Sequence, residues 1–519
     1  MTPVDAKSGP RGPFMRLADA LVDPARRDRV VAVGLIAYVA VWALYGALAK
    51  GSQDIHFDMG EVIAWSREPA WGTPKHPPLS AWLAKAWFSV FPLVDWAYYL
   101  FAMVVATVGL WVAWVLSGRY LDDERRPFGL ALLTLVPFYN FHALKFNANS
   151  VLIPVWALTT LFFLRSFESR RPGEAALAGF FAAAAMYGKY WSIMLIAGLG
   201  IAALTDRRRR AYFGSAAPWV TMAVGAVTLA PHLVWLSAND FSPFGYALAS
   251  HAAADVWTVV AVALGFLGGA VAYMAVPAAL VLMVARPSLS TIADALWPRS
   301  VERRLVAVAF WAPLLMATLA AIAARALIVS LWAMPALTLL PVVLLSAPGI
   351  VVPRAALARL LAIAVALPIA ATLAAPGIAY VIHRNGVPNY ATHYRLLAAA
   401  IDRAWHETTK QPLRLVGSYT NIVNGVVFYL VDRPSTYDVI GPSETPWVDD
   451  ARVARDGMAL VCPLKEAGCL RAVEAYAAAR PVARRLEVEI SRSYFGVSDA
   501  PERYLIIIIR PREPIDLRH

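Results

Sequence analysis

Residues 165–210 of this 519-residue chain read RSFESRRPGEAALAGFFAAAAMYGKYWSIMLIAGLGIAALTDRRRR, a long apolar segment with arginine clusters at both ends. A membrane helix needs about 20 apolar residues, so the apolar part, Ala175–Leu204, is long for one helix and tight for two. Arginine-rich flanks favour the cytoplasmic side of a membrane. Because both flanks carry such clusters, the segment is expected to cross the membrane twice, as a hairpin with Lys189 near its tip.

The composition of the whole chain also indicates a membrane protein. Hydrophobic residues make up 59% and charged residues 16%, whereas soluble domains run near ~25% charged. A large soluble enzyme and a disordered chain are therefore excluded. The net charge of +12 comes from 47 Lys and Arg against 35 Asp and Glu. Because many of the arginines gather in short clusters between apolar segments, this charge indicates membrane topology, with membrane lipids and not a nucleic acid as partner.

The same reasoning predicts about eleven membrane spans. Seven single spans are expected at Val30–Ala49, Trp96–Leu116, Ala211–Leu236, Trp257–Val284, Leu305–Ala324, Ala326–Leu345 and Leu360–Val381. Arginines also flank both ends of Phe128–Leu164, which is therefore expected to form a second hairpin beside Ala175–Leu204. All the arginine clusters then fall on one side, which places the N-terminus in the cytoplasm and the C-terminus outside.

Composition shifts divide the chain into three parts. Residues 1–29 have no signal-peptide features and are expected to form a cytosolic tail. Residues 30–381 are expected to form a membrane domain with a large outward first loop at 50–95, and residues 382–519 a periplasmic domain. Within the loop, AWLAKAWFSVF suits an interfacial helix. In the last part, patterns such as LRLVGSY, STYDVI and RYLIIIIR predict a small α/β domain. Cys462 and Cys469 both lie there, and the sequence leaves open whether they form a disulfide or remain two buried thiols.

Ionisable residues gather on the outer side of the predicted helices, where such costly groups are expected to be functional. The first outward loop carries Asp54, His56, Asp58, Glu61, Lys75 and His76. The tips of three hairpins carry Lys145, Lys189 and Arg325. Carboxylates with converging cations suit a site that deprotonates a hydroxyl and holds a phosphate leaving group.

Structural explanations compete with this interpretation. For Asp54, a solvated loop charge is the favoured explanation. Asp58 and Glu61 stand three residues apart, so they share a face of any helix there, and this favours a functional pair. The three hairpin cations are individually explained equally well as anchors that extend to the membrane surface, and only their common depth favours phosphate binding. His232 and His251 are interpreted as polar residues near helix ends.

The loop sequence DMGEVIAWSREPAWGTPKHPPLSAWL (58–83) resembles the first periplasmic loop of bacterial protein O-mannosyltransferase-like glycosyltransferases with the GT-C fold, a superfamily that includes the lipid A aminoarabinose transferase. FNANSVLIPVWALTTLFFLR and AAAAMYGKYWSIMLI look like the hairpins that follow this loop in that family. The resemblance covers residues 30–350. Many members have Asp-Glu where this chain has Asp58-Met59, whereas the acidic residue at Glu61 is kept. The missing glutamate would be a candidate metal ligand, so the resemblance leaves open whether the protein uses a divalent cation.

The resemblance implies a polytopic α-helical GT-C protein of the bacterial inner membrane with a periplasmic α/β domain. Its implied activity is inverting transfer of a sugar from a polyprenyl-phosphate donor to a lipid or glycan acceptor, such as lipopolysaccharide. Asp58 is the implied general base, supported by Glu61. The residues expected to bind the donor phosphate are Lys75, His76, Lys145, Lys189 and Arg325. The alternatives are a transporter or flippase of a lipid-linked glycan, for which no internal repeat is found, and a scaffolding subunit.

Overall fold

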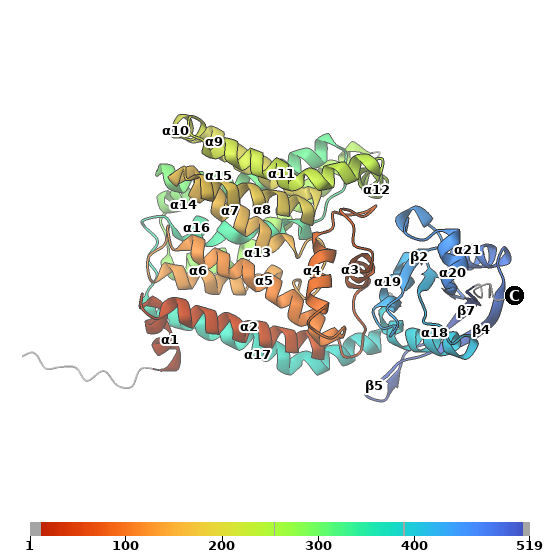
Figure 1. The fold of residues 1–519 in the computed structure, drawn as a ribbon. Helices are drawn as coiled ribbons and strands as arrows, with labels where there is room; N and C mark the ends of the chain where they lie inside the picture. Colours follow the sequence, from red (N-terminus) through yellow and green to blue (C-terminus); the bar gives the residue numbers. More distant parts are fainter. Residues whose placement is uncertain (1–11, 254, 388–389, 512–519) are drawn as a thin grey trace, which may run out of the picture.

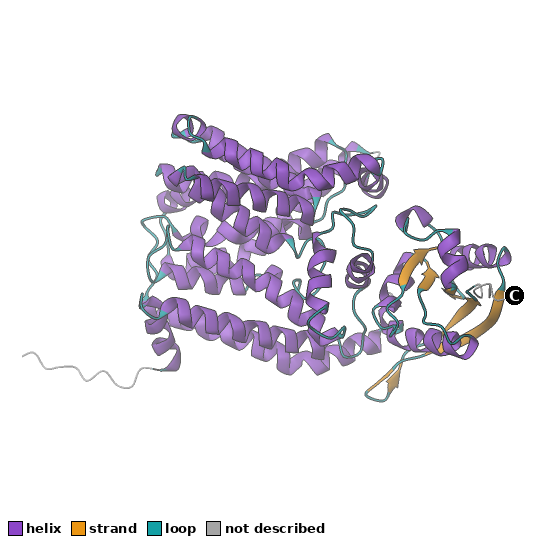
Figure 2. Cartoon of the chain, viewed as in Figure 1, coloured by secondary structure: helices purple, strands orange, loops and turns teal. Residues whose placement is uncertain are grey.

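The computed structural model describes residues 12–253, 255–387 and 390–511 (Figure 1). Long helices run side by side in a bundle, and the C-terminal domain, in blue, lies at one end of it. The strands belong to this C-terminal domain (Figure 2). The start of the predicted cytosolic tail and the end of the predicted periplasmic domain, residues 1–11 and 512–519, lie outside the described residues.

Among the described residues, six helices are long and apolar enough to cross a membrane: α2 (Arg27–Ala49), α5 (Asp95–Ser117), α11 (Ala217–Ala238), α13 (Val256–Ala285), α15 (Val301–Ala323) and α17 (Arg354–Asn385). An α-helix rises about 1.5 Å per residue, so even the 22 residues of α11 reach across a hydrocarbon core of about 30 Å. These helices correspond to six of the seven predicted single spans. The chain is an integral membrane protein.

The two predicted hairpins are built from shorter helices. They comprise α6 (Arg125–Thr134), η1 (Pro137–Tyr139) and α7 (Leu152–Ser169), then α8 (Pro172–Gly188), η2 (Tyr190–Ser192) and α9 (Ile193–Thr205). The second hairpin packs closely on α11. At Gly179 in α8, a Cβ atom would lie 2.2 Å from the carbonyl oxygen of Thr221. Only glycine therefore allows the two backbones to come this near, as is common between membrane helices.

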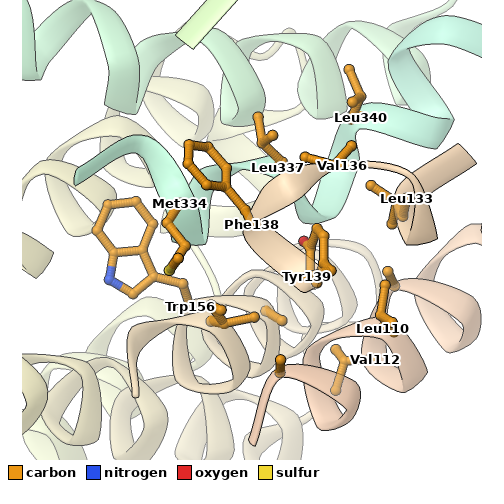
Figure 3. Packing of buried hydrophobic residues seen from close by; sticks show 14 of the residues in the cluster. Leu110, Val112, Leu133, Val136, Phe138, Tyr139, Trp156, Met334, Leu337 and Leu340 are labelled. Carbon is orange, nitrogen blue, oxygen red and sulfur yellow. The ribbon is translucent and has the colours of Figure 1, made fainter. Parts of the chain in front are cut away.

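The segment predicted as a span at Ala326–Leu345 is not a regular α-helix. It forms the 3₁₀-helix η3 (Ser330–Leu339), which contains Pro335, followed by the short helix α16 (Leu340–Leu345). Proline has no N–H group to donate, so it interrupts the α-helical pattern. Such backbone is tolerated at membrane depth where protein surrounds it. Figure 3 shows it packed in the buried core with Met334, Leu337, Leu340, Phe138 and Trp156.

Shorter helices precede the first span or connect later ones. They are α1 (Pro13–Val22), α10 (Arg209–Phe213), α12 (Ser242–His251) and α14 (Leu289–Leu296). The first of these lies in the predicted cytosolic tail and was not expected from the sequence. It is held to the bundle because Arg354, at the start of α17, donates a hydrogen bond to Asp19 at 2.8 Å.

The first outward loop contains two helices, α3 (Phe57–Arg67) and α4 (Leu79–Phe88). The second matches the interfacial helix predicted from AWLAKAWFSVF. In Figure 1, both helices lie between the bundle and the C-terminal domain. The two helices of the loop therefore lie where the bundle and the C-terminal domain meet.

The C-terminal domain is a small α/β domain, as predicted from its sequence patterns. Its five-stranded sheet has the order β2 (Ser435–Asp438), β1 (Leu415–Ser418), β3 (Met458–Pro463), β7 (Glu502–Ile509) and β4 (Val482–Ile490). The first three strands are parallel, and β7 runs antiparallel to both of its neighbours. Adjacent residues of β7 alternate between two cores. One face packs against α18 (Tyr394–Thr408) and α19 (Thr420–Val427), the other against α20 (Asp450–Asp456) and α21 (Ala467–Ala478).

Short elements complete this domain. They are η4 (Tyr390–Thr392), η5 (Pro442–Glu444), and the strands β5 (Ser493–Tyr494) and β6 (Val497–Ser498), which pair as a hairpin. The hairpin contacts the bundle, because the His383 imidazole of α17 is hydrogen-bonded to the Val497 carbonyl at 2.9 Å.

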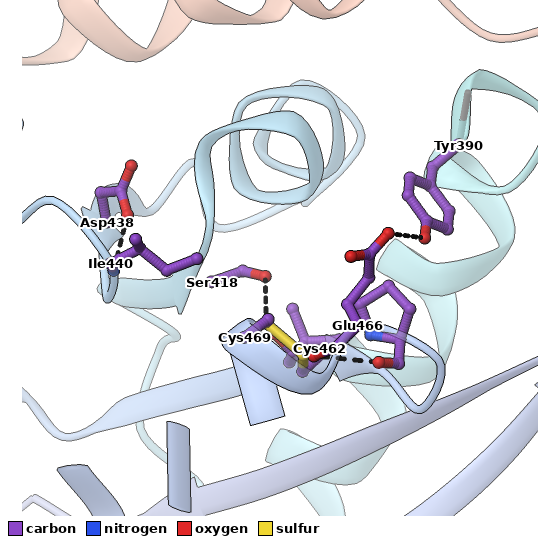
Figure 4. The surroundings of a disulfide bond; sticks show 9 residues. Tyr390, Ser418, Asp438, Ile440, Cys462, Glu466 and Cys469 are labelled. Atoms are coloured by element: carbon purple, nitrogen blue, oxygen red, sulfur yellow. Dashed lines mark hydrogen bonds between the residues drawn. A yellow bond between two sulfur atoms is a disulfide. The ribbon is translucent and has the colours of Figure 1, made fainter. Parts of the chain in front are cut away.

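The two cysteines form a disulfide, which decides between the alternatives that the sequence left open (Figure 4). Cys462 lies at the end of β3 and Cys469 in the first turn of α21, with their Cα atoms 6.0 Å apart. The disulfide therefore ties the outer helix layer to the central sheet.

Candidate active site

Asp58 and Glu61 lie on α3, the helix of the outward loop. The helix begins after His56, whose Nδ1 accepts a hydrogen bond from the Asp58 backbone N–H at 3.1 Å. Gly60, between the two acidic residues, touches α19, and a Cβ there would lie 2.1 Å from the Asn424 carbonyl oxygen. The same helix thus contacts the C-terminal domain and presents two carboxylates three residues apart, on one face.

The Asp58 carboxylate pairs with the tip of the first membrane hairpin. Its Oδ2 atom lies 2.8 Å from the Lys145 Nζ and accepts a hydrogen bond from Asn147 at 3.2 Å. Burial alone would raise the pKa of Asp58, but Lys145, His56 and Asn147 outweigh it, and the pKa lies below its ordinary value. Asp58 is therefore ionised at neutral pH.

The Glu61 carboxylate pairs with Lys75, which lies further along the same loop. The Lys75 Nζ donates to Glu61 Oε1 at 2.7 Å, and the Glu61 side chain is only 8% exposed. Burial raises the pKa of Glu61 to about 7, against the effect of Lys75. Burial lowers the pKa of Lys75, but Glu61 more than offsets this and holds it above its ordinary value. Both carboxylates of α3 thus have a lysine partner.

A cavity of about 390 Å³ is lined by Lys75, the hydrogen-bond partner of Glu61. Lys75, His76 and Lys189 line it together with mostly apolar and aromatic side chains from α12, α15 and η3. Lys189 Nζ donates to Asn149 Oδ1 at 2.8 Å and lies 4.1 Å from the centre of the Trp332 ring. Apolar walls with two cations are the features that a lipid phosphate requires.

A second cavity, of about 230 Å³, is lined by Lys145, the ion-pair partner of Asp58. Its polar lining consists of Lys50, Gln53, Asp54, His56 and Lys145, and its apolar lining includes Tyr45, Tyr99 and Ile378. The acidic face of α3 therefore has one carboxylate paired with a lysine of each cavity. Lys145, expected from the sequence to bind the donor phosphate with the other cations, does not line the first cavity.

Two further expectations differ from the structure. Asp54 is 2% exposed and therefore not a solvated loop charge; it pairs with Arg492 of the C-terminal domain at 3.0 Å. Arg325 is exposed and does not line the first cavity, although its neighbours Ala324 and Ala326 do. Its depth in the membrane was predicted from hydropathy, which says nothing about the direction of a side chain.

Within the described ranges 12–253, 255–387 and 390–511, one group of side chains has the spacing of a metal site: Asp402, His406 and Asp432, in the C-terminal domain. The carboxylates of α3 do not belong to this group. At the α3 face, lysines supply the positive charge.

Comparisons with known proteins agree with this architecture. The family model described as dolichyl-phosphate-mannose-protein mannosyltransferase matches residues 75–235. No curated protein sequence matches the chain. The crystal structure of ArnT from Cupriavidus metallidurans bound to undecaprenyl phosphate is 15% identical and has a TM-score of 0.59, and the alignment covers 92% of this chain and 97% of that one. The same protein in the apo state gives 13% identity, a TM-score of 0.61 and coverage of 92% and 98%. The chain has the GT-C fold.

Sequence reasoning missed several residues that line the first cavity of this GT-C bundle. Tyr246 and His251 come from α12, a short helix between two spans, and Trp332 from the irregular segment η3. In the sequence, nothing separates Trp332 from the other tryptophans of the chain, and His251 is interpreted as a polar residue near a helix end. Their role depends on which helices become neighbours, and no local pattern reports that.

Proposed function

We propose that this protein transfers a sugar from a polyprenyl-phosphate donor to a glycolipid or glycan acceptor, at the outer face of the bacterial inner membrane. One observation carries the proposal: an apolar cavity contains Lys75 and Lys189, and the acidic face of α3 begins where Lys75 meets Glu61. A lipid phosphate and a reacting hydroxyl need these two environments side by side. The match with ArnT bound to undecaprenyl phosphate supports a donor of this class.

The donor lies in the first cavity in this proposal. The polyprenyl chain contacts apolar residues such as Leu327 and Ile328, and the phosphate meets Lys75 and Lys189. A phosphate diester becomes a monoester dianion when the sugar leaves. Two nearby cations in a site with little water stabilise that developing charge strongly. Burial lowers the pKa of His76 well below its ordinary value, so it acts as a neutral hydrogen-bonding partner.

The acceptor approaches from the second cavity, next to Asp58. The ionised Asp58 takes the proton from the acceptor hydroxyl. The hydroxyl oxygen attacks the anomeric carbon, the bond from that carbon to the phosphate oxygen breaks, and the configuration inverts. Lys145 and Asn147 orient the base, and Glu61 holds Lys75 against the leaving phosphate.

The test is reconstitution of the purified protein in lipid nanodiscs with synthetic polyprenyl-phosphate sugars and candidate envelope glycolipids. Release of polyprenyl phosphate together with a glycosylated product supports the proposal. Movement of intact donor across a vesicle membrane, without cleavage of the sugar–phosphate bond, would instead favour a flippase. Mass spectrometry of envelope glycolipids from a deletion strain then identifies the acceptor.

A further inference from the structure

A buried ion pair joins the outward loop to the C-terminal domain, four residues before Asp58. The Asp54 side chain is 0% exposed, and its Oδ1 accepts a hydrogen bond from Arg492 Nη2 at 3.0 Å. Its Oδ2 accepts one from the Arg395 backbone N–H at 2.9 Å. A buried carboxylate is costly unless it is paired and hydrogen-bonded, so the loop keeps this shape only while the C-terminal domain supplies these donors.

Arg492 also binds the backbone on either side of this pair. Its Nη1 donates to the Thr392 carbonyl at 3.1 Å and reaches the Ser52 carbonyl at 3.5 Å. A third contact comes from Tyr429, after α19, whose hydroxyl accepts from the Ile55 backbone N–H at 2.9 Å. Three parts of the C-terminal domain thus fix residues 52–55 of the loop.

The fixed segment leads directly into the reactive helix. His56 follows Ile55 and caps α3, and its ring accepts from the backbone N–H of Asp58 itself. On the other side, Asp58 meets Lys145 from the membrane bundle. The carboxylate is therefore located by two bodies, the bundle through Lys145 and the C-terminal domain through Asp54.

We propose that Arg492 and Asp54 are positioning residues, through which the C-terminal domain holds Asp58 in place for the transfer reaction. This inference rests on the proposed function. Arg492 lines neither cavity, and Asp54, at the wall of the second cavity, has both carboxylate oxygens engaged by Arg492 and the Arg395 backbone N–H. Their effect on the reaction therefore passes through the position of α3. A displacement of about 1 Å in a reacting group costs about 10²-fold in rate. The C-terminal domain is then part of the catalytic assembly, and not only a cover for the bundle.

The experiment compares turnover and donor affinity in the full-length protein. Arg492→Met should lower kcat by about 10²-fold and leave the donor Kd unchanged, because Lys75 and Lys189 remain in place. Arg492→Lys should recover part of kcat, since an ammonium can still face Asp54. The matched control is Arg480→Met, which breaks an ion pair with Asp450 in the same domain, away from the loop, and should keep full turnover.

A second measurement separates positioning from general damage. In an Asp58→Asn background, Arg492→Met should lower turnover little further, because the group that it positions is already gone. Equal losses in both backgrounds, or a parallel loss of donor binding in Arg492→Lys, would overturn the inference. So would full turnover in Arg492→Met when the unchanged protein is active. Absence of transfer by the unchanged protein would overturn the proposed function itself.

Discussion

Replacing Asp58 with Asn tests the chemical centre of the proposed reaction. The change is nearly isosteric, so the hydrogen bond from Asn147 and the cap of α3 can persist. It removes the negative charge that accepts the proton. A positioned general base contributes about 10²–10⁴-fold in rate, equivalent to about 3–5 kcal/mol of activation free energy.

The effect on folding should be much smaller than the effect on turnover. The Asp58 side chain is 22% exposed and the Lys145 side chain 41% exposed, so water screens their ion pair. A pair of this kind contributes about 1 kcal/mol or less to the free energy of unfolding. Donor binding should also persist, because Lys75 and Lys189 lie in the other cavity.

The assay is sugar transfer from a synthetic polyprenyl-phosphate donor to a purified glycolipid, with donor binding measured on the same preparations. Asp294→Asn is the matched control, because it breaks an ion pair with Arg303 at 2.6 Å between α14 and α15, away from α3. It should keep full turnover. If Asp58→Asn also transfers sugar at the normal rate, Asp58 is not the base, and the arrangement of the two cavities around it has another purpose.

Three further outcomes are expected. Lys189→Met should weaken donor binding by about 10–100-fold, as expected for the loss of one charged phosphate contact, whereas Arg325→Met should leave it unchanged; equal effects would contradict the cavity assignment. Burial raises the pKa of Glu61 to about 7, so between its ordinary pKa and about pH 7 the folded state binds more protons than the unfolded state. The free energy of unfolding should therefore fall as the pH rises through this range. Glu61→Gln should remove this slope in calorimetry. Alkaline phosphatase fused after His519 should be active, because the C-terminal domain is proposed to lie in the periplasm. Inactive phosphatase would contradict that location.

Local patterns in the sequence were sufficient for much of the fold. Apolar length and arginine flanks predicted the spans and hairpins because burial of a helix in lipid depends on its own composition. The strands of the C-terminal domain were predicted for a similar reason, since a buried β7 needs the run Leu505–Ile509 whatever its partners are. The prediction was wrong in detail at Ala326–Leu345, where prolines and tertiary packing replaced an α-helix with η3 and α16.

The candidate site was predicted only as a set of residue types on one side of the membrane. Asp58, Glu61, Lys75, Lys145 and Lys189 were named from charge and motif. The structure brings the first four together as two lysine–carboxylate pairs, and it places Lys75 and Lys189 at one cavity and Lys145 at another. The division of the cations between those cavities was beyond the sequence. Depth in a membrane follows from hydropathy, but the direction of a side chain follows from neighbouring helices.

The sequence by itself determined that this chain crosses a membrane many times and carries an α/β domain at its end, because both properties depend on the burial of each segment's own side chains. The tertiary structure alone decided that Asp54 is buried by Arg492. It also decided that Arg325 stays exposed outside the cavity and that Lys145 faces Asp58. The contact between Asp54 and Arg492 joins residues 438 positions apart in the chain. The energy of such contacts arises only when two distant segments meet and exclude water.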